Sequence, residues 1–409
     1  MTSTNKLKIL NDPIYGFITI PSERIFSIIE HPYFQRLRRI SQMGMSYLVY
    51  PGAHHTRFHH AIGCVHLMQK AVQILRHKGV MISEAEEEAL QIAILLHDIG
   101  HGPFSHAMEH SIVEGVDHES ISLLFMEEMN RDFNQSLTLA LQIFRGTYNR
   151  RFLNQLISSQ LDMDRLDYLK RDSFYTGAAE GNINSERLIT MLNVVNDDLV
   201  IEEKGIYSVE KFLVARRLMY WQVYLHKTSL VAEQLLIRVL KRAKELIDKD
   251  EKLNASKSLS YFLYNKIGPE NFTSETLAVF ARLDDYDIVS AMKEWQDHED
   301  FVLSNLCKMI INRDLLKVKI KKKKPSAQKL EKRRIALQEK QNISAEEAAY
   351  FVFSGEVTNT AYKSENNNIN ILHKNGKISD VAKASDQLNL KALSKTVVKY
   401  YMCYPKAKH

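Results

Sequence analysis

The sequence reads Leu95-Leu96-His97-Asp98-Ile99-Gly100-His101-Gly102-Pro103-Phe104-Ser105-His106 at the point where an apolar run ends. Residues 89–96 predict a helix, and the glycines and proline that follow predict its end. An imidazole and a carboxylate side by side at a helix end can bind one divalent ion, because imidazole suits Zn, Fe, Ni or Mn and carboxylate adds a hard oxygen. His101 and His106 lie on the turn beyond, where a substrate can reach them. The alternative, in which His97 and Asp98 only cap a buried helix, explains so dense a group of ionisable residues poorly.

The composition is that of an ordinary globular protein. The 409 residues are 45% hydrophobic and 25% charged, enough for a large core in two lobes or in one domain with additions. No apolar run reaches ~18 residues, so no membrane-spanning helix is expected. Cys64, Cys307 and Cys403 are too widely spaced for a disulfide framework or a CxxC metal site. With no apolar segment typical of a signal peptide at the N-terminus, a cytoplasmic location is expected. The net charge of +6 suits an anionic substrate.

The N-terminal residues predict a β-hairpin over 7–20 and a helix over 31–43. Three arginines of that helix, Arg36, Arg38 and Arg39, fit a solvated face and a phosphate-binding face equally well.

Histidines gather at residues 54–60, where the chain enters a helix predicted over 61–77. Helix N-termini favour anions, so this segment is placed to meet an anionic ligand. The histidines cannot all be ligands, and His54, His55 and His59 are individually more typical of structural or supporting positions.

A second informative stretch covers residues 158–173. On a helix, Asp164, Tyr168 and Asp172 are spaced at i, i+4 and i+8 and share one face. Such a row suits a polar cleft better than a core, although a salt-bridged surface helix is the alternative.

Two further places carry candidate chemistry. His118 lies beside Glu119, and because histidine side chains in general change charge near neutral pH, it is a candidate acid or base. In a long helix or helix pair predicted over 210–246, Arg216 and Tyr224 share a face; core packing explains the tyrosine but not the arginine.

Residues after about 250 differ in character from those before. Between Arg313 and Arg334 there are eleven Lys or Arg and two acids, which is typical of a solvated face or loop and less often of a nucleic-acid contact. Strands are predicted at 348–353, 369–372 and 396–404, with a hairpin turn at Asn375-Gly376, and another hairpin is predicted to turn at Lys204-Gly205. The sequence therefore predicts a mainly α fold, with a helical lobe over 1–245 and a mixed α/β lobe over 246–409.

His60, His97-Asp98 and Asp164, taken together, resemble the H…HD…D metal signature of the HD phosphohydrolase superfamily. Flanking motifs resemble its deoxynucleotide triphosphohydrolase branch, which includes the SAM-and-HD-domain dNTPases and their bacterial relatives. These motifs are Asn11-Asp-Pro-Ile-Tyr-Gly16, Phe34-Gln-Arg-Leu-Arg38, Tyr50-Pro-Gly-Ala-His54, Arg57-Phe-His-His60, His97-Asp-Ile-Gly-His-Gly-Pro-Phe-Ser-His106 and Asp164-Arg-Leu-Asp-Tyr168. The resemblance runs through about residue 240 with strong motifs and more loosely beyond.

The resemblance implies hydrolysis of a dNTP to deoxynucleoside and inorganic triphosphate. It implies one divalent transition metal (Mn, Fe, Zn or Ni), held by His60, His97, Asp98 and Asp164, while Mg can accompany the nucleotide. The implied catalytic residues are His118, Glu119, His101 and His106. The implied substrate-binding residues are Gln42, Arg57, Arg165, Tyr168, Asp172, Arg216 and Tyr224. Relatives often carry lysine at the position of Arg165, a change that keeps the charge but adds a fork.

Relatives of this branch are often tetramers that nucleotides activate at sites between subunits. The resemblance therefore implies a homo-oligomer, a dimer or tetramer, and a nucleotide activator. The implied activator positions are Lys8, Asn11, Glu30, Gln35 and Arg38. Glu30 stands where relatives that read guanine tend to carry aspartate, so the base preference is left open.

Two other classes of function compete with this one. The first is another HD phosphohydrolase activity, a nucleoside monophosphatase or cyclic-nucleotide phosphodiesterase; Arg57, Arg165 and Tyr168 favour a triphosphate instead. The second is nucleic-acid binding by the run Arg313–Arg334, which is not favoured because the run lacks interleaved aromatic residues for base stacking. A membrane partner has no support.

Overall fold

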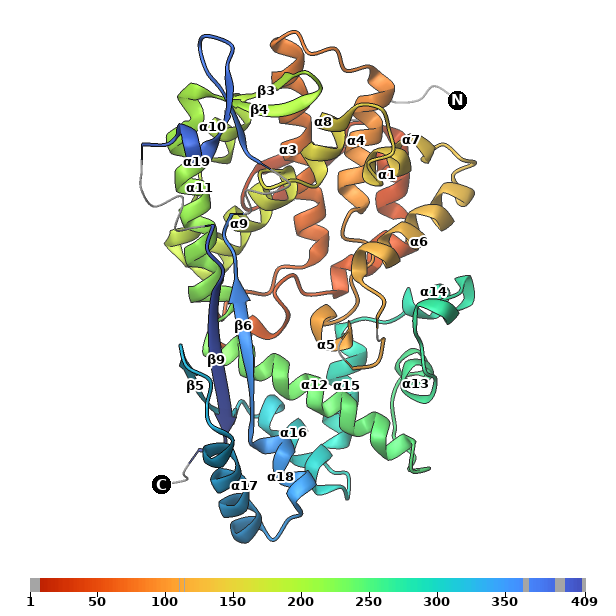
Figure 1. Ribbon diagram of the computed structural model, residues 1–409. Helices are drawn as coiled ribbons and strands as arrows, with labels where there is room; N and C mark the ends of the chain where they lie inside the picture. The colour runs from red at the N-terminus through yellow and green to blue at the C-terminus, as the bar shows by residue number, and fades with distance from the viewer. Residues whose placement is uncertain (1–7, 110, 114, 363–367, 387–393, 407–409) are drawn as a thin grey trace.

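The computed structural model describes residues 8–109, 111–113, 115–362, 368–386 and 394–406, and it is mainly helical (Figure 1). The N-terminal part contains β1 (Ile9–Asp12), β2 (Gly16–Thr19), α1 (Glu23–Glu30), α2 (Pro32–Gln35), α3 (Arg57–His77), α4 (Glu84–Leu96), α5 (Ser105–Glu109), α6 (His118–Asp132), α7 (Thr138–Phe144), α8 (Arg151–Ile157), α9 (Met163–Thr176), α10 (Ser185–Thr190), β3 (Leu192–Val195), β4 (Asp198–Glu202), α11 (Ile206–Met219) and α12 (Lys227–Ile247). The remainder contains α13 (Lys257–Tyr264), α14 (Ser274–Phe280), α15 (Asp285–Trp295), α16 (Phe301–Ile311), β5 (Lys317–Lys321), α17 (Ala327–Gln341), α18 (Ala345–Phe351), β6 (Phe353–Asn359), β7 (Asn370–Leu372), β8 (Ile378–Asp380), α19 (Val381–Ala384) and β9 (Val397–Tyr404). The predicted fold class, a helical part followed by a mixed α/β part, is confirmed.

Helix α3 is the centre of the N-terminal part. It is buried on most of its surface and packs against α4, α9 and α10. Ser83 begins α4 by a reciprocal capping bond with Glu86, and Asp162 begins α9 by accepting from the backbone N–H of Arg165. These caps fix where α4 and α9 begin. The packing of α3 against both helices brings the start of α3, the end of α4 and the start of α9 to one place. No helix in the described ranges is long and apolar enough to cross a membrane.

The helix predicted over 31–43 is shorter than expected. After α2 the chain continues as a 3-10 turn, Arg36–Arg39, and then becomes extended at Ile40. Arg36 is fully buried and donates to the carbonyls of Ile99 and His101 at 2.6 and 2.9 Å, so neither predicted role for it is correct. Carbonyls in the tight turn after α4 need donors, and Arg36 supplies them.

The hairpin near residue 200 turns at a different place from the predicted Lys204-Gly205. Strands β3 and β4 are joined by Asn196 and Asp197, both with positive φ, as a tight two-residue hairpin turn requires. Gly205 instead ends a 3-10 turn that leads into α11. The prediction was wrong because Ile206–Val209 alternates like a strand but begins a helix.

The C-terminal residues form two sheets with distant partners. The predicted strand at 348–353 is mostly α18, which Ser344 begins with a capping bond to Glu347. The strands at the other two predicted places are confirmed as β7 and β9, and Asn375-Gly376 turns between β7 and β8. Strand β7 pairs in parallel with β4, so C-terminal residues extend a sheet begun in the N-terminal part. The division near residue 245 stays a prediction.

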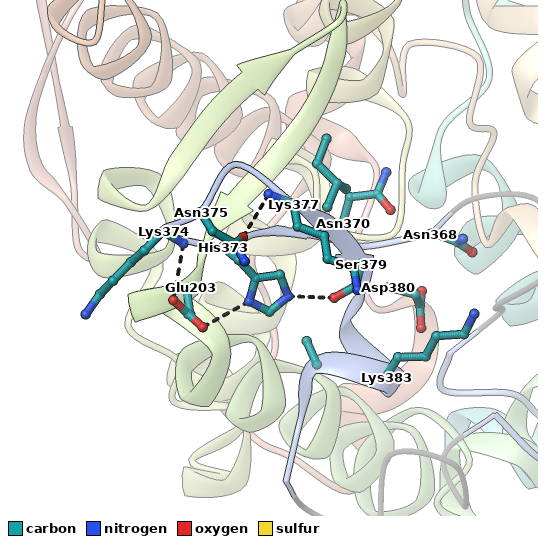
Figure 2. Close-up of a pocket in the computed structure, with 12 residues that line it drawn as sticks. Glu203, Asn368, Asn370, His373, Lys374, Asn375, Lys377, Ser379, Asp380 and Lys383 are labelled. Carbon is teal, nitrogen blue, oxygen red and sulfur yellow. Dashed lines mark hydrogen bonds and ion pairs between the residues drawn. The ribbon is translucent and has the colours of Figure 1, made fainter.

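A cavity of about 860 Å³ lies along the β7–β8 hairpin (Figure 2). His373 spans it, with Nδ1 at 2.9 Å from Glu203 and Nε2 at 2.8 Å from Ser379. Both acids of its lining, Glu203 and Asp380, already have polar partners. None of the sequence-predicted site residues lines this cavity.

Candidate metal centre

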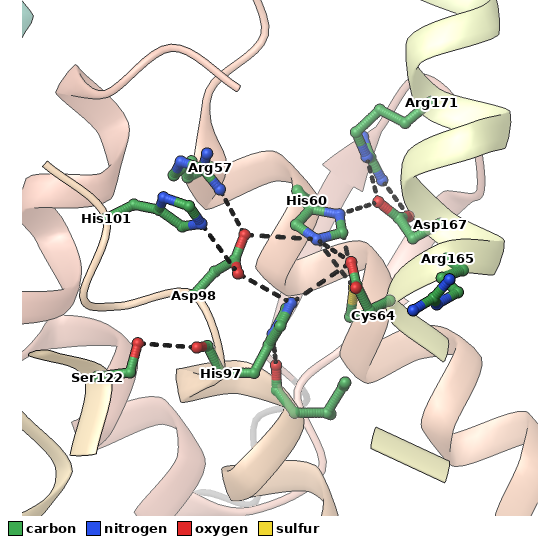
Figure 3. Close-up of polar contacts among 12 residues, drawn as sticks. Arg57, His60, Cys64, His97, Asp98, His101, Ser122, Arg165, Asp167 and Arg171 are labelled. Carbon is green, nitrogen blue, oxygen red and sulfur yellow. Dashed lines mark hydrogen bonds and ion pairs between the residues drawn. The ribbon is translucent and has the colours of Figure 1, made fainter. Parts of the chain in front are cut away.

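The structure brings the four predicted metal ligands together (Figure 3). His60 comes from the first turn of α3, His97 and Asp98 follow the end of α4, and Asp164 comes from the first turn of α9. His60 Nε2 lies 3.1 Å from Asp164 Oδ1, and His97 Nε2 lies 3.5 Å from Asp98 and 3.6 Å from Asp164. The imidazoles are buried, while the Asp164 side chain is 30% exposed and leaves the cluster open to solvent.

The hydrogen bonds of the histidines define what their Nε2 atoms do. His97 Nδ1 lies 2.6 Å from the carbonyl of Ile94, which can only accept, so Nδ1 carries the proton. In the neutral ring the Nε2 lone pair then faces the carboxylates of Asp98 and Asp164, and this buried nitrogen has no hydrogen-bond partner among the described residues. Lone pairs that face one another repel unless a cation lies between them, so this donor set fits a divalent ion.

His60 is held by Asp167. His60 Nδ1 lies 2.7 Å from Asp167 Oδ2, which leaves Nε2 directed at Asp164. Arg171 grips the same carboxylate with two hydrogen bonds, at 2.8 and 3.0 Å, and reaches Asp12 of β1 at 2.7 Å. Burial raises the pKa of Asp167, but the charge of Arg171 and the bond to His60 outweigh it and lower that pKa to about 2. The sequence alone does not indicate a role for Asp167, Arg171 or Asp12; the one available signal is that Asp167 follows Asp164 by three residues on α9.

Cys64 also lies beside the cluster. His60, Cys64 and His97 each offer a donor atom within 4.8 Å of the others. Burial raises the pKa of the Cys64 thiol, so it stays protonated, and a thiol is a much poorer ligand than a thiolate. Cys64 lies one helical turn after His60, a spacing that is visible in the sequence.

Two side chains, those of Arg57 and His101, contact the carboxylate of Asp98. Arg57 Nη1 donates to Asp98 Oδ2 at 2.5 Å, and His101 Nε2 lies 3.4 Å from Oδ1. Burial and the charge of Arg57 lower the pKa of His101 to about 3, against the attraction of Asp98. The His101 ring stacks on that of His118 with centroids 4.0 Å apart. Of the other predicted catalytic residues, Glu119 is exposed, and the side chain of His106 lies outside the described residues.

Three of the predicted substrate-binding residues, Asp172, Tyr224 and Tyr168, lie together. Asp172 is buried between His55 Nε2 at 2.7 Å and the Tyr224 hydroxyl at 2.8 Å. Tyr168 meets Tyr224 edge to face, with centroids 6.2 Å apart. His55 thus has a supporting position, as expected.

The remaining predicted substrate residues are less closely joined. Arg165 pairs with Asp162 at 3.2 Å, and Arg216 donates to the carbonyl of Ala361 at 3.1 Å. Gln42 has a buried side-chain oxygen with no hydrogen-bond partner among the described residues.

The predicted activator positions all lie on or beside the N-terminal hairpin and the short helices after it. Lys8 pairs with Glu23 at 2.8 Å, and Gln35 accepts from Arg38 Nε at 2.9 Å. Asn11 and Glu30 are exposed. This group contains none of the predicted metal ligands. It adjoins the residues that hold His60, because Asn11 is next to Asp12 on β1 and Asp12 accepts a hydrogen bond from Arg171.

The chain is similar to known proteins over the segments that carry this cluster. Residues 57–172 match the HD domain, and residues 183–261 match the HD associated region. An uncharacterized protein of Bacillus subtilis, YwfO, is 35% identical over 318 residues, covering 75% of this chain and 71% of that protein. The deoxynucleoside triphosphate triphosphohydrolase SAMHD1 homolog of Dictyostelium discoideum is 30% identical over 284 residues, covering 63% of this chain and 55% of that protein.

A solved structure is similar over nearly the whole chain. The crystal structure of a phosphohydrolase from Bacteroides thetaiotaomicron has a TM-score of 0.95 and 51% sequence identity, covering 98% of this chain and 100% of that chain. Together with the matching domain and the assembled His and Asp residues, these similarities show that the chain belongs to the HD-domain phosphohydrolase family.

Proposed function

We propose that this hydrolase is a metal-dependent dNTP triphosphohydrolase that releases deoxynucleoside and inorganic triphosphate. The observation that carries the proposal is the Nε2 of His97, which has no hydrogen-bond partner among the described residues and faces the carboxylates of Asp98 and Asp164 beside the cation Arg57. A divalent ion held by His60, His97, Asp98 and Asp164 would lower the pKa of a bound water and polarise a phosphoryl oxygen.

The surrounding residues suit a triphosphate ester of a deoxysugar. Arg57 pairs with Asp98, and Arg165 lies on α9 next to Asp164 in the sequence. Both cations are placed near the candidate metal ligands, where they can neutralise phosphate oxygens (Figure 3). His118, stacked on the ring of His101, supplies a ring nitrogen for proton transfer to the leaving oxygen, and His101 lies beside it. Asp172, fixed by His55 and Tyr224, can accept a hydrogen bond from a 3′-hydroxyl, and the Tyr168 ring can exclude a 2′-hydroxyl. The SAMHD1 relative supports this assignment by its named activity.

The direct test is to incubate the purified protein with Mn²⁺ or Mg²⁺ and each dNTP, singly and in mixtures, and to separate the products by chromatography. We expect inorganic triphosphate and deoxynucleoside in equal amounts. Release of orthophosphate or pyrophosphate would contradict the proposed cleavage at the α-phosphate. If no dNTP mixture is cleaved, the assay is repeated with nucleoside monophosphates and cyclic nucleotides, whose hydrolysis would favour the other HD activities.

We also propose that a nucleotide activates a homo-oligomer through the N-terminal residues. The double variant Lys8→Ala/Arg38→Ala removes two exposed or half-buried cations from this region and none of the metal ligands. We expect activation by a second nucleotide to be lost while the metal content stays that of the wild type. Unchanged activation in the double variant would remove this part of the proposal, and light scattering with and without nucleotide measures the oligomer.

A further inference from the structure

A second cavity, of about 440 Å³, lies between α16, the C-terminal end of α17 and the residues just after β9. These helices lie at the lower end of the view in Figure 1, whereas α3, α4 and α9, which carry the candidate metal ligands, lie in its upper half. Five residues of α16 line the cavity with the spacing of one helix face, and they are Phe301, Asn305, Lys308, Met309 and Asn312. None of the metal ligands, predicted substrate residues or predicted activator positions lines it.

Much of the lining of this cavity is hydrocarbon. Leu315, Leu316 and Phe351 line it and are at most 5% exposed, so they join it to the core of the protein. The Phe351 ring meets the Phe301 ring edge to face, with centroids 5.9 Å apart. Leu337 of α17 completes this part of the lining and is half-buried. Such a lining favours the hydrocarbon part of a ligand, because each apolar group that enters it leaves water.

Helix α17 does not close over the cavity. No residue of α17, which the structure describes throughout, is buried, and its Ile335 is 47% exposed. A helix with apolar residues is normally packed with those residues against a neighbour. Here the space between α16 and α17 separates two elements of the same chain. A small molecule in this space would cover Leu337 and complete the packing of α17.

The charged residues of the lining are mostly cations. Three lysines line the cavity, Lys308, Lys340 and Lys406, and Asp314 is the one acid among the lining residues that the structure describes. Asp314 is already offset, since its Oδ1 lies 3.4 Å from Nζ of Lys406. Lys308 and Lys340 are exposed, so their ammonium groups can remain in water while their methylene stems cover apolar surface. The lining therefore complements a ligand that joins a hydrocarbon chain to a negative charge.

We propose that the cavity between α16 and α17 is a binding site for a free alkyl carboxylate, an unesterified fatty acid of about eight to twelve carbons whose volume matches a small-molecule pocket. The hydrocarbon chain lies against Leu315, Leu316 and Phe351, and the carboxylate pairs with Lys308 or Lys340. A sugar or a nucleotide fits poorly, because its hydroxyl groups would lose water to an apolar lining without gaining partners. This site is independent of the proposed hydrolysis and of its residues.

The test is isothermal titration calorimetry of the full-length protein with octanoate, decanoate and dodecanoate, each below the concentration at which it forms micelles. We expect saturable binding whose affinity rises by about fourfold per added CH₂ while the chain still fits, because each buried methylene contributes a nearly constant free energy. Decanol, which has the same chain without the charge, is expected to bind about fivefold more weakly than decanoate, as the loss of an exposed ion pair predicts.

Matched variants locate the binding. Leu337→Trp places a larger side chain in the cavity from a helix without buried residues, so we expect an intact fold and decanoate binding weakened by about tenfold or more. Lys308→Gln/Lys340→Gln is expected to weaken decanoate about fivefold and to leave decanol unchanged. Lys293→Gln is the control, since Lys293 is an exposed lysine of α15 that does not line the cavity. His97→Ala is expected to bind decanoate as the wild type does, so failure of the proposed hydrolysis leaves this test intact.

Each outcome decides the proposal. Binding that strengthens with chain length, prefers decanoate to decanol and is weakened by Leu337→Trp supports it. Absence of binding by all three acids, or decanoate binding that Leu337→Trp leaves unchanged, overturns it. Equal affinity for decanoate and decanol overturns the part given to the lysines, and with it the assignment to a carboxylate. Sedimentation with phosphatidylglycerol vesicles but no binding of a monomeric acid overturns the proposal in favour of a membrane surface. A smaller mass of ligand-free Leu337→Trp by light scattering overturns it in favour of a second copy of the chain.

Discussion

The His97→Ala variant is expected to lose its bound divalent ion and to fall in dNTP hydrolysis by about a hundredfold or more, since changes even to residues that support metal ligands cost that much. His97 contributes the one buried Nε2 of the cluster that has no hydrogen-bond partner among the described residues. Alanine removes the Nε2 atom that would bind the ion, so the remaining carboxylates of Asp98 and Asp164 bind a cation more weakly. Metal content by elemental analysis and product release by chromatography measure the two effects.

His54→Ala is the matched control for this variant. His54 is exposed, and its ring stacks on Tyr47 rather than facing the metal ligands. We expect its metal content and hydrolysis to stay close to those of the wild type. Retention of stoichiometric metal and full activity by His97→Ala would show that the cluster is not the metal centre.

The Arg171→Met variant is expected to lose about 3–5 kcal/mol of stability, the usual cost of removing one partner from a buried ion pair. Arg171 is fully buried and is bonded to Asp167 and Asp12, whose side chains are at most 3% exposed. Methionine keeps much of the volume but leaves two carboxylates buried without their cation. The free energy of unfolding is measured by urea denaturation without added metal, so that ion binding does not contribute.

An exposed ion pair provides the control for Arg171→Met, and the dependence of stability on pH provides a second measurement. Arg131→Met, which breaks an exposed pair with Glu128, is expected to change stability by no more than about 1 kcal/mol. The folded-state pKa of Asp167 is lowered to about 2 from an ordinary 3.8. Its contribution is therefore present above about pH 4 and lost as the pH falls toward 2. Arg171→Met is expected to flatten this acid limb, and an unchanged limb would contradict the role given to the pair.

The four candidate metal ligands could be predicted to lie together from the sequence because each was expected at or near a helix end. The apolar run before His97, the glycines after it and the helical spacing that starts at Asp164 are local patterns, and α4 and α9 have the predicted positions. Arg36 could not be placed in this way. Its burial depends on the carbonyls of Ile99 and His101, more than 60 residues later, and no local pattern reports such a contact.

Asp167 and Arg171, which hold His60 in place, could not be predicted from the sequence for a related reason. Asp167 and Arg171 look like one more surface pair at i and i+4 until α9 is packed against α3. The packing places Asp167 beside His60, and burial changes a weak pair into one that fixes a ligand. The strand predicted at 348–353 is wrong for a local reason. The capping bond between Ser344 and Glu347 starts a helix and outweighs the β-propensity of the residues that follow.

The bond between Asp12 and Arg171 has a consequence for biosynthesis. Asp12 is among the first residues to leave the ribosome, and its partner follows 159 residues later. Asp167, the hydrogen-bond partner of His60, likewise follows it by 107 residues. A nascent chain that has not yet released α9 therefore carries His60 without Asp167, which orients it, and without Asp164. A chain truncated before this helix would leave the ribosome without Asp164, and so without the complete set of candidate ligands.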